Sequence, residues 1–193
     1  MKIILVGAHG TGKSTLAKDL QKHYKWPVIE SASRDIRGLV EKERQEIRRQ
    51  TGHLAFLTDQ DIHKIITAMN IKLWRDTEIS SRRVPHIYTR TLIDNIAYSE
   101  PEEWNEMLDV LKTFDFEDAI FLRIPIEFGI ENDGVRYTGQ EYQERVSDNL
   151  DLILKKMIEA GKISENQIYH ISGSPEERLE SAMDYIEDNM YLG

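Results

Sequence analysis

Cysteine is absent from the 193 residues of the chain, which excludes disulfide bonds, thiolate metal sites and a cysteine nucleophile. Long apolar runs are also missing, and the run at residues 2–6 is too short for a signal peptide or a membrane span. There are only five prolines, and no repeat or low-complexity stretch occurs. These absences predict one cytoplasmic domain over residues 1–193 with no membrane partner.

Positive charge is scarce, since 25 lysines and arginines face 34 aspartates and glutamates and the formal net charge is −9. Each phosphate contact of a polynucleotide needs a cation, so this balance argues against a nucleic-acid partner. The arginine-rich segments 44–49 and 82–83 are predicted to be solvated helix faces, because acidic residues interleave with the first of them.

Buried strands and amphipathic helices alternate along the chain. Residues 2–6 form an apolar run that ends in glycine, which is typical of a strand buried on both faces. Helical spacing of apolar residues follows from Lys13. Further strands are expected at residues 26–29, 87–88, 119–124 and 167–171, with helices at residues 35–80, 100–114, 142–161 and 174–190. This order predicts a three-layer α/β fold with a five-stranded parallel sheet that binds ligands beyond the carboxyl ends of its strands.

Residues 7–14, Gly-Ala-His-Gly-Thr-Gly-Lys-Ser, match the phosphate-loop pattern G-x-x-x-x-G-K-S. Glycines let backbone N–H groups turn toward phosphate oxygens, the lysine reaches the β and γ phosphates, and the serine hydroxyl ligates Mg²⁺. We therefore predict the P-loop NTPase fold, with ATP and Mg²⁺ bound here and Ser14 as the metal ligand. For His9, a phosphate contact and a solvent-facing position are both open, and the second is favoured. The expected nucleotide contacts are Gly7, His9, Gly10, Thr11, Gly12, Lys13, Ser14 and Thr15.

Two further absences narrow the class of phosphate-loop protein. No Asn-Lys-x-Asp motif is present, which speaks against a GTPase, and the strand expected at residues 119–124 does not end in aspartate, which speaks against motors and helicases. Small-molecule kinases remain, and these need arginines on a lid that closes over the transferring phosphoryl group. Arg136 lies in the polar loop 132–139 and Arg145 on the next helix, so we expect a mobile lid at about residues 126–145. Solvated surface arginines are the alternative.

Residues 88–99, Tyr-Thr-Arg-Thr-Leu-Ile-Asp-Asn-Ile-Ala-Tyr-Ser, resemble the Asp-Arg-x-x-x-Asp-x-x-x-Tyr segment of the thymidylate-kinase-like and nicotinamide-riboside-kinase-like P-loop families. Residues 132–136 with Arg145 resemble the lid of that group, and residues 30–34, Glu-Ser-Ala-Ser-Arg, resemble its Glu-x-x-x-Arg element. Residues 172–178 are similar to its last strand-to-helix loop, which packs near adenine. Small phage deoxynucleoside monophosphate kinases belong to this group.

The resemblance implies roles for individual residues. It implies that Arg90 holds the acceptor or its phosphate and that Arg34 helps to bind it, although a surface ion pair is equally open for Arg34. Glu30 is implied to contact the acceptor sugar or the metal. Arg136 and Arg145 are implied to stabilise the transferring phosphoryl group.

Asp94 and Tyr98 are implied to order the site, but a helix-start role for Asp94 and a core position for Tyr98 are favoured. One departure from the family pattern concerns position 89, where the group usually has aspartate before the arginine and this chain has Thr89. Glu30, Asp94 and Asp133 are the alternative sources of the carboxylate that is missing at position 89.

The acceptor decides the subclass of kinase. A nucleoside kinase needs a carboxylate base, for which Glu30 is suited, whereas a monophosphate kinase needs cations for an acceptor that is already an anion. Arg34, Arg37 and Arg90 favour the second case, so we expect a deoxynucleoside monophosphate kinase. A nucleoside or nicotinamide riboside kinase, a kinase acting on a modified base in DNA, and a non-catalytic nucleotide-binding switch are the alternatives. A homodimer formed through the helices at residues 40–80 is a further hypothesis.

Overall fold

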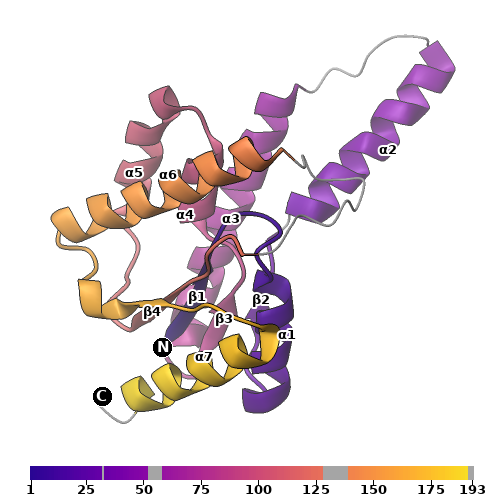
Figure 1. Cartoon of the computed structure of the whole chain (residues 1–193). Helices are drawn as coiled ribbons and strands as arrows, with labels where there is room; N and C mark the ends of the chain where they lie inside the picture. The colour runs from indigo at the N-terminus through magenta and orange to yellow at the C-terminus, as the bar shows by residue number, and fades with distance from the viewer. Residues whose placement is uncertain (32, 52–57, 128–138, 191–193) are drawn as a thin grey trace.

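The computed structural model describes residues 1–31, 33–51, 58–127 and 139–190 (Figure 1). The strands are β1 (Lys2–Val6), β2 (Val28–Ile29), β3 (His86–Tyr88), β4 (Ala119–Arg123) and β5 (Ile168–His170). The helices are α1 (Lys13–Tyr24), α2 (Ser33–Thr51), α3 (Asp59–Ser81), α4 (Leu92–Tyr98), α5 (Trp104–Leu111), α6 (Gln140–Glu159) and α7 (Pro175–Met190). Two short 3-10 turns, Pro101–Glu103 and Glu165–Gln167, precede α5 and β5.

The five strands form one sheet in the order β2-β3-β1-β4-β5, and every neighbouring pair is parallel. In the centre, Ile4 of β1 pairs with Tyr88 of β3 on one side and with Phe121 of β4 on the other. The predicted five-stranded parallel sheet is therefore confirmed. Because all strands point the same way, their carboxyl ends lie at one edge, and the loop after β1 lies in the middle of that edge.

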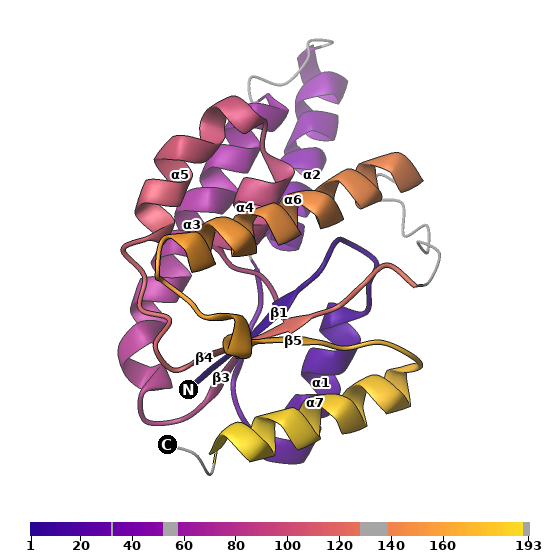
Figure 2. The ribbon, with the colours of Figure 1, turned by 60° about the vertical axis from the view of Figure 1, so that its left-hand side comes forward.

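Helices cover both faces of the sheet, so the predicted three layers are confirmed (Figure 2). Strand residues alternate between the two sides: Ile4 and Val6 pack in the core beneath α3–α6, whereas Ile3 and Leu5 pack in the core beneath α1 and α7. All four side chains have no exposed surface. This alternation explains the uninterrupted apolar run of β1, since both of its faces are covered.

The second strand is shorter than predicted, because only Val28 and Ile29 of the expected residues 26–29 pair with β3. Pro27 has no N–H to donate to a sheet. Trp26 instead stacks on Tyr24, with ring centres 4.1 Å apart, and packs in the core beneath α1. The strands predicted at residues 119–124 and 167–171 are each confirmed and shortened at their ends.

The same capping box begins α3 and α4. In each, a threonine precedes the helix and an aspartate three residues later accepts the threonine N–H, as Thr58 with Asp61 and Thr91 with Asp94, both at 2.9 Å. This arrangement satisfies N–H groups that the first turn of a helix leaves without partners. The box at Thr91 begins the seven-residue helix α4, which agrees with the helix-start role favoured for Asp94, although the sequence patterns gave no bounds for a helix there.

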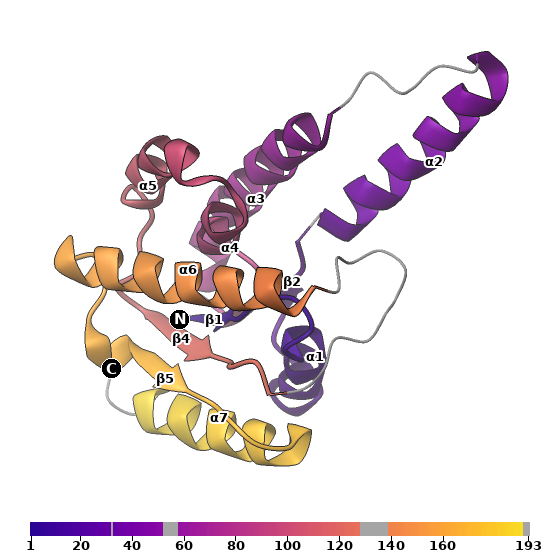
Figure 3. The same cartoon turned by 45° about the horizontal axis from the view of Figure 1, so that its top comes forward.

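Helix α2 extends away from the rest of the molecule (Figure 3). The helical patterns predicted for residues 35–80 are confirmed as α2 and α3. Arg48, Arg49, Arg82 and Arg83 are exposed, as predicted for solvated faces, and α2 also exposes Leu39 to 64%. Pairing of two copies through these helices stays a prediction. None of the described helices is both long and apolar enough to cross a membrane.

Candidate active site

The phosphate loop, residues 7–14, leaves the carboxyl end of β1 and enters α1 directly. Gly10 and Gly12 have φ angles of 80° and 90°, a region that favours glycine. A Cβ on Gly7 would lie 2.8 Å from the carbonyl oxygen of Ile124, so this position also requires glycine. No side chain caps α1. The first N–H groups of the helix are thus available to an anion at its positive end.

The side chain of Lys13 lies back over the loop that precedes it. Its ammonium donates to the carbonyl oxygen of Ala8 at 2.7 Å and to that of Gly7, and the residue is only 6% exposed. Ser14 and Thr15, by contrast, are exposed at the start of α1. The predicted phosphate and metal contacts therefore lie together at the edge of the sheet.

His9 is buried, with 6% of its surface exposed, so the favoured solvent-facing position is wrong. Its N–H donates to the phenolic oxygen of Tyr98 at 2.8 Å, and its carbonyl oxygen accepts from Nε2 of Gln143 at 2.7 Å. The physical reason is that α4 and α6 both pack over this part of the loop, which a sequence pattern of the loop alone does not reveal. His9 thereby joins the loop to both helices.

Aromatic rings and arginines gather around His9. The centre of its ring lies 6.0 Å from that of Tyr98 and 5.9 Å from that of Tyr142. The guanidinium of Arg90 lies 5.0 Å from the ring centre of Tyr98, and that of Arg145 lies 5.0 Å from the ring centre of Tyr142. At such distances a cation is attracted to the ring face. The structure thus brings two arginines, predicted from distant segments, to the same side of the phosphate loop.

Tyr98 is half-buried and packs against the hydrophobic core, which agrees in part with the predicted core position. Its hydroxyl contacts two nitrogen atoms of His9. Besides the N–H of His9, that hydroxyl has Nδ1 of the same histidine at 3.2 Å. Burial raises the pKa of Tyr98, while the neighbouring Arg90 opposes this shift. The phenol therefore stays protonated at neutral pH and links the loop to the residues that follow β3.

Asp94 lies in the first turn of α4 and closes its capping box, as the helix-start interpretation predicted, and it is also buried. Its Oδ2 accepts the N–H of Thr91 at 2.9 Å, whereas Oδ1 is buried without a hydrogen-bond partner within the described parts of the chain. Burial raises the pKa of Asp94, and the charges of Lys13 and Arg90 oppose that shift. The charges of both cations therefore favour the ionised form of this carboxylate.

Thr89 is buried at the end of β3 and its side chain faces β2. Its backbone N–H donates to the carbonyl oxygen of Ile29 at 3.1 Å, and its hydroxyl lies 3.4 Å from the same oxygen. Glu30, directly after β2, is exposed. The predicted carboxylate and arginine thus follow neighbouring strands, with no acidic side chain at position 89 between them.

Strand β4 ends in an arginine that is fully engaged. Arg123 is 4% exposed, donates to both carboxylate oxygens of Asp151 at 2.6 and 2.9 Å, and also contacts the Ser147 hydroxyl at 2.7 Å. A bidentate pair of this kind fixes α6 against the sheet. Arg123 is therefore a structural residue.

A second cluster, which the sequence patterns did not predict as such, lies on the other side of the loop. Arg178 of α7 donates to the carbonyl oxygen of Thr11 at 2.6 Å and to the carboxylate of Glu127 at 2.5 Å. Glu127 also accepts the N–H of Gly173 at 2.9 Å. A cavity of about 90 Å³ beside this cluster is lined by Gly10, Gly12, Thr15, Leu16, Asp19, Pro175 and Arg178. The resemblance at residues 172–178 predicted that this segment packs near the nucleotide, but no pattern pointed to Glu127 or Gln143 individually.

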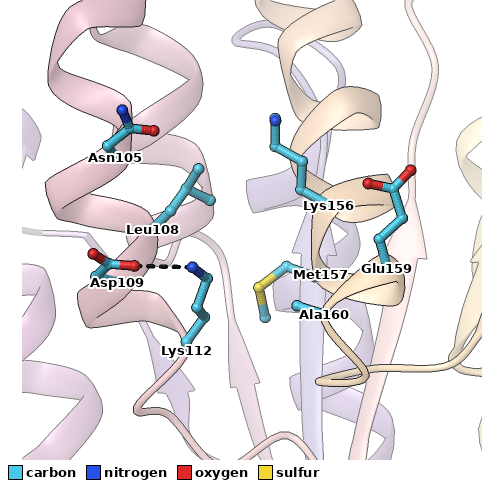
Figure 4. Close-up of a pocket in the computed structure, with 8 residues that line it drawn as sticks. All are labelled: Asn105, Leu108, Asp109, Lys112, Lys156, Met157, Glu159 and Ala160. Carbon is cyan, nitrogen blue, oxygen red and sulfur yellow. Dashed lines mark hydrogen bonds and ion pairs between the residues drawn. The ribbon is translucent and has the colours of Figure 1, made fainter.

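The larger hollow of about 400 Å³ lies elsewhere, between α5 and α6 (Figure 4). Met157 and Leu108 contribute apolar surface to it, and Lys112 on its wall donates to Asp109 at 2.9 Å. None of its lining residues was predicted as a site residue, and it does not touch the phosphate loop. We therefore assign the candidate active site to the edge of the sheet that carries the phosphate loop, and not to this hollow.

Two predicted site residues are not covered by these observations. Arg136, with most of the predicted lid, lies outside the described residues, and so does the side chain of Arg34. Within the described ranges, no group of three or more acidic or histidine side chains is placed to hold a metal ion. A metal at Ser14 would thus take most of its ligands from water and phosphate, which suits Mg²⁺.

Solved structures share this fold at low sequence identity. Thymidylate kinase from Candida albicans has a TM-score of 0.67 and 17% identity, with 98% of this chain and 92% of that chain covered. Deoxyadenosine kinase from M. mycoides has a TM-score of 0.60 and 13% identity, with coverages of 97% and 100%. The NadR protein in complex with NR has a TM-score of 0.65 and 15% identity, with coverages of 97% and 51%. No curated protein sequence matches the chain.

A family model described as an AAA domain matches residues 2–178. This span contains the phosphate loop, the sheet and the first turn of α7. The chain therefore belongs to this AAA domain family, and its fold is the one found in the P-loop nucleotide and nucleoside kinases.

Proposed function

We propose that the protein transfers the γ-phosphoryl group of ATP, with Mg²⁺, to a small nucleotide, and that the acceptor is a deoxynucleoside monophosphate. The observation that carries this proposal is the convergence of Lys13, Arg90 and Arg145 around His9 at one edge of the sheet. Charge spreads over the transferring phosphoryl group in the transition state, and fixed cations stabilise it there.

Different residues of the chain would bind the phosphates, hold the metal ion and stabilise the transferring group. The uncapped start of α1 and the glycines of the loop bind the phosphates, and Lys13 exchanges its contacts with Gly7 and Ala8 for phosphate oxygens. The exposed hydroxyl of Ser14 fits a magnesium ion, which neutralises phosphate charge when it is bound. Arg145, at the start of α6, lies over the ring of Tyr142, which is itself close to the ring of His9, and this supports a role for it at the transferring group.

A phosphate acceptor fits the charge of the site. Lys13 and Arg90 carry two positive charges against the single carboxylate of Asp94, so the described centre favours an anion. An acceptor that is already an anion needs no base. A nucleoside or nicotinamide riboside acceptor is the second candidate, because the exposed carboxylate of Glu30 follows β2 and could accept a hydroxyl proton.

The test is ATP turnover with Mg²⁺ against deoxy- and ribonucleoside monophosphates, free nucleosides, nicotinamide riboside and a short DNA. Turnover that requires one monophosphate supports the proposal and names the substrate. Turnover with nucleosides alone overturns the acceptor class and assigns Glu30 as the base. ATP binding without turnover on any acceptor overturns the kinase and leaves a nucleotide-dependent switch.

A further inference from the structure

The sequence leaves the peptide groups around Thr11 weakly restrained. Glycines flank this residue on both sides, and Gly10 and Gly12 have positive φ angles of 80° and 90°. Glycine adopts several backbone conformations at similar free energy, so these peptide groups can rotate at little cost. A phosphate loop needs its N–H groups in one orientation, because they must converge on the same oxygen atoms. A contact from outside the glycines therefore has to fix this part of the loop.

Arg178 of α7 makes such a contact. The residue is 4% exposed, and its Nη1 donates to the carbonyl oxygen of Thr11 at 2.6 Å. Thr11 is itself buried, and its hydroxyl donates to the carbonyl oxygen of Ala8 at 2.9 Å. The C=O of Thr11 and the N–H of Gly12 belong to one peptide group, and in a trans peptide they point in opposite directions. Holding the oxygen toward α7 therefore turns the N–H of Gly12 away from that helix.

Glu127 holds Arg178 in this position. Its carboxylate accepts a hydrogen bond from Nη2 of Arg178 and another from the N–H of Gly173 at 2.9 Å. A buried guanidinium needs such a counter-charge, and the planar fork of arginine lets one group contact Thr11 and Glu127 together. The hydrogen bond with Arg178 lowers the pKa of Glu127, so the pair is ionised at neutral pH. The segments that follow β4 and β5 are thus joined to the phosphate loop through one side chain.

We propose that Arg178, held by Glu127, orients the peptide group between Thr11 and Gly12 so that its N–H faces the phosphates of a bound nucleotide. Arg178 is a positioning residue, because it acts through the backbone of the loop. The inference rests on the proposed function in one respect, namely that donor phosphates bind at this loop. It differs from the role that the resemblance implies for residues 172–178, because it concerns the phosphates and not the base.

Three other roles for Arg178 predict different results. If the guanidinium contacts the base, its loss weakens the binding of ADP and leaves that of a polyphosphate without a base unchanged. If it only adds positive charge, the loss of Glu127 strengthens polyphosphate binding, because the local field becomes more positive. If the pair only holds α7 in place, its loss lowers the unfolding temperature and leaves the affinities of the folded protein unchanged.

The experiment compares Arg178→Met, Arg178→Lys and Glu127→Ala, with Glu180→Ala, which removes an exposed carboxylate from α7, as the control. MgADP binding is measured by calorimetry and inorganic tripolyphosphate binding by competition with MgADP, at a temperature at which circular dichroism shows each variant folded. Arg178→Met should weaken both ligands about tenfold, as expected for the loss of one hydrogen bond to an anion.

The other variants should show graded effects on the same two ligands. Arg178→Lys should retain part of the affinity, because an ammonium lacks the fork that contacts Thr11 and Glu127 together. Glu127→Ala should weaken both ligands about threefold, and Glu180→Ala should change neither. If Arg178→Met does not fold, Arg178→Lys and Glu127→Ala carry the test, since the first keeps the buried charge and the second alters a partly exposed side chain.

Unchanged tripolyphosphate binding in Arg178→Met, tighter tripolyphosphate binding in Glu127→Ala, or a lower unfolding temperature with unchanged affinities would each overturn the proposal. None of these measurements uses an acceptor. A wild-type protein that binds both ligands but transfers no phosphoryl group would end the proposed function, while the affinities of the variants would still decide the role of Arg178. A wild-type protein that binds neither ligand would overturn both proposals.

Discussion

The phenolic oxygen of Tyr98 lies 2.8 Å from the backbone nitrogen of His9, so the last residue of α4 holds the phosphate loop directly. The same tyrosine ring lies under the guanidinium of Arg90. The loop that would bind the donor and the arginine that would bind the acceptor therefore share one side chain. This relationship makes the hydroxyl of Tyr98 a sensitive point for both stability and turnover.

Tyr98→Phe should lower the free energy of unfolding by about 1–3 kcal/mol, because the N–H of His9 loses its acceptor in a partly buried place. Denaturant unfolding measures this loss. The matched control is Tyr169→Phe, which removes a hydroxyl contact of 3.1 Å with Ser181 on the far side of the molecule. The acceptor KM should rise in the first variant and stay constant in the second; equal KM values in both would show that the Tyr98 hydroxyl does not serve the acceptor side.

Lys13→Ala should abolish phosphoryl transfer while the fold persists, since the lysine is the cation that leaves Gly7 and Ala8 for the phosphates. Circular dichroism and turnover measure the two effects separately. Lys22→Ala, which removes an exposed ammonium paired with Asp19 on the same helix, should keep full turnover. Wild-type rates in the Lys13 variant would contradict the mechanism.

Gly7→Ala should impair both folding and ATP binding, because the new methyl group would lie 2.7 Å from Oγ1 of Thr11 and 2.8 Å from the carbonyl oxygen of Ile124. The backbone oxygen cannot move away without shifting the strand end. Gly38→Ala is the counterpart, since nothing lies within 4 Å of its added carbon. It should stabilise α2 by about 0.5–1 kcal/mol and leave ATP affinity as it was. Thermal unfolding and nucleotide titration distinguish the two, and tolerance of alanine at position 7 would refute the close approach of the loop to Ile124.

The pH dependence of Asp94 should act oppositely on stability and on activity. Burial raises its folded-state pKa above the ordinary value of 3.8, so the folded protein binds the proton more tightly than the unfolded chain does. The stabilisation from protonated Asp94 is full below the unfolded pKa and is lost as pH rises through the raised folded pKa. Turnover should rise over the same window, because the ionised carboxylate, whose charge interacts with those of Lys13 and Arg90, forms there.

Asp94→Asn provides the comparison for this prediction. Its unfolding free energy should lack the decline above the ordinary aspartate pKa, and the acidic limb of its kcat profile should flatten. Parallel pH profiles of the wild type and the variant, for both stability and kcat, would show that another group titrates in this window.

The sequence predicts the fold well where periodicity and loop chemistry agree. The apolar run of β1, the glycines after it and the helical spacing from Lys13 each have a local cause, and the parallel order of the strands follows from their alternation with helices. Arg90 and Glu30 lie at strand ends, as predicted, for the same reason. The residues around the loop are harder to predict, because contacts such as His9 with Gln143 join positions 134 residues apart. No local pattern encodes such a contact, which explains both the wrong prediction for His9 and the absence of any prediction for Glu127.

Arg123, which ends β4 and is hydrogen-bonded to α6, bears on whether water could attack a bound nucleotide. In enzymes that hydrolyse nucleotides, a side chain near the phosphates orients the attacking water. Here Arg123 fills that strand end and is tied to Asp151 and Ser147, so this position offers no acceptor for a water proton. A base that activates water beside a bound nucleotide would thus have to come from another element. The end of β4 would hold α6 in place and take no part in hydrolysis.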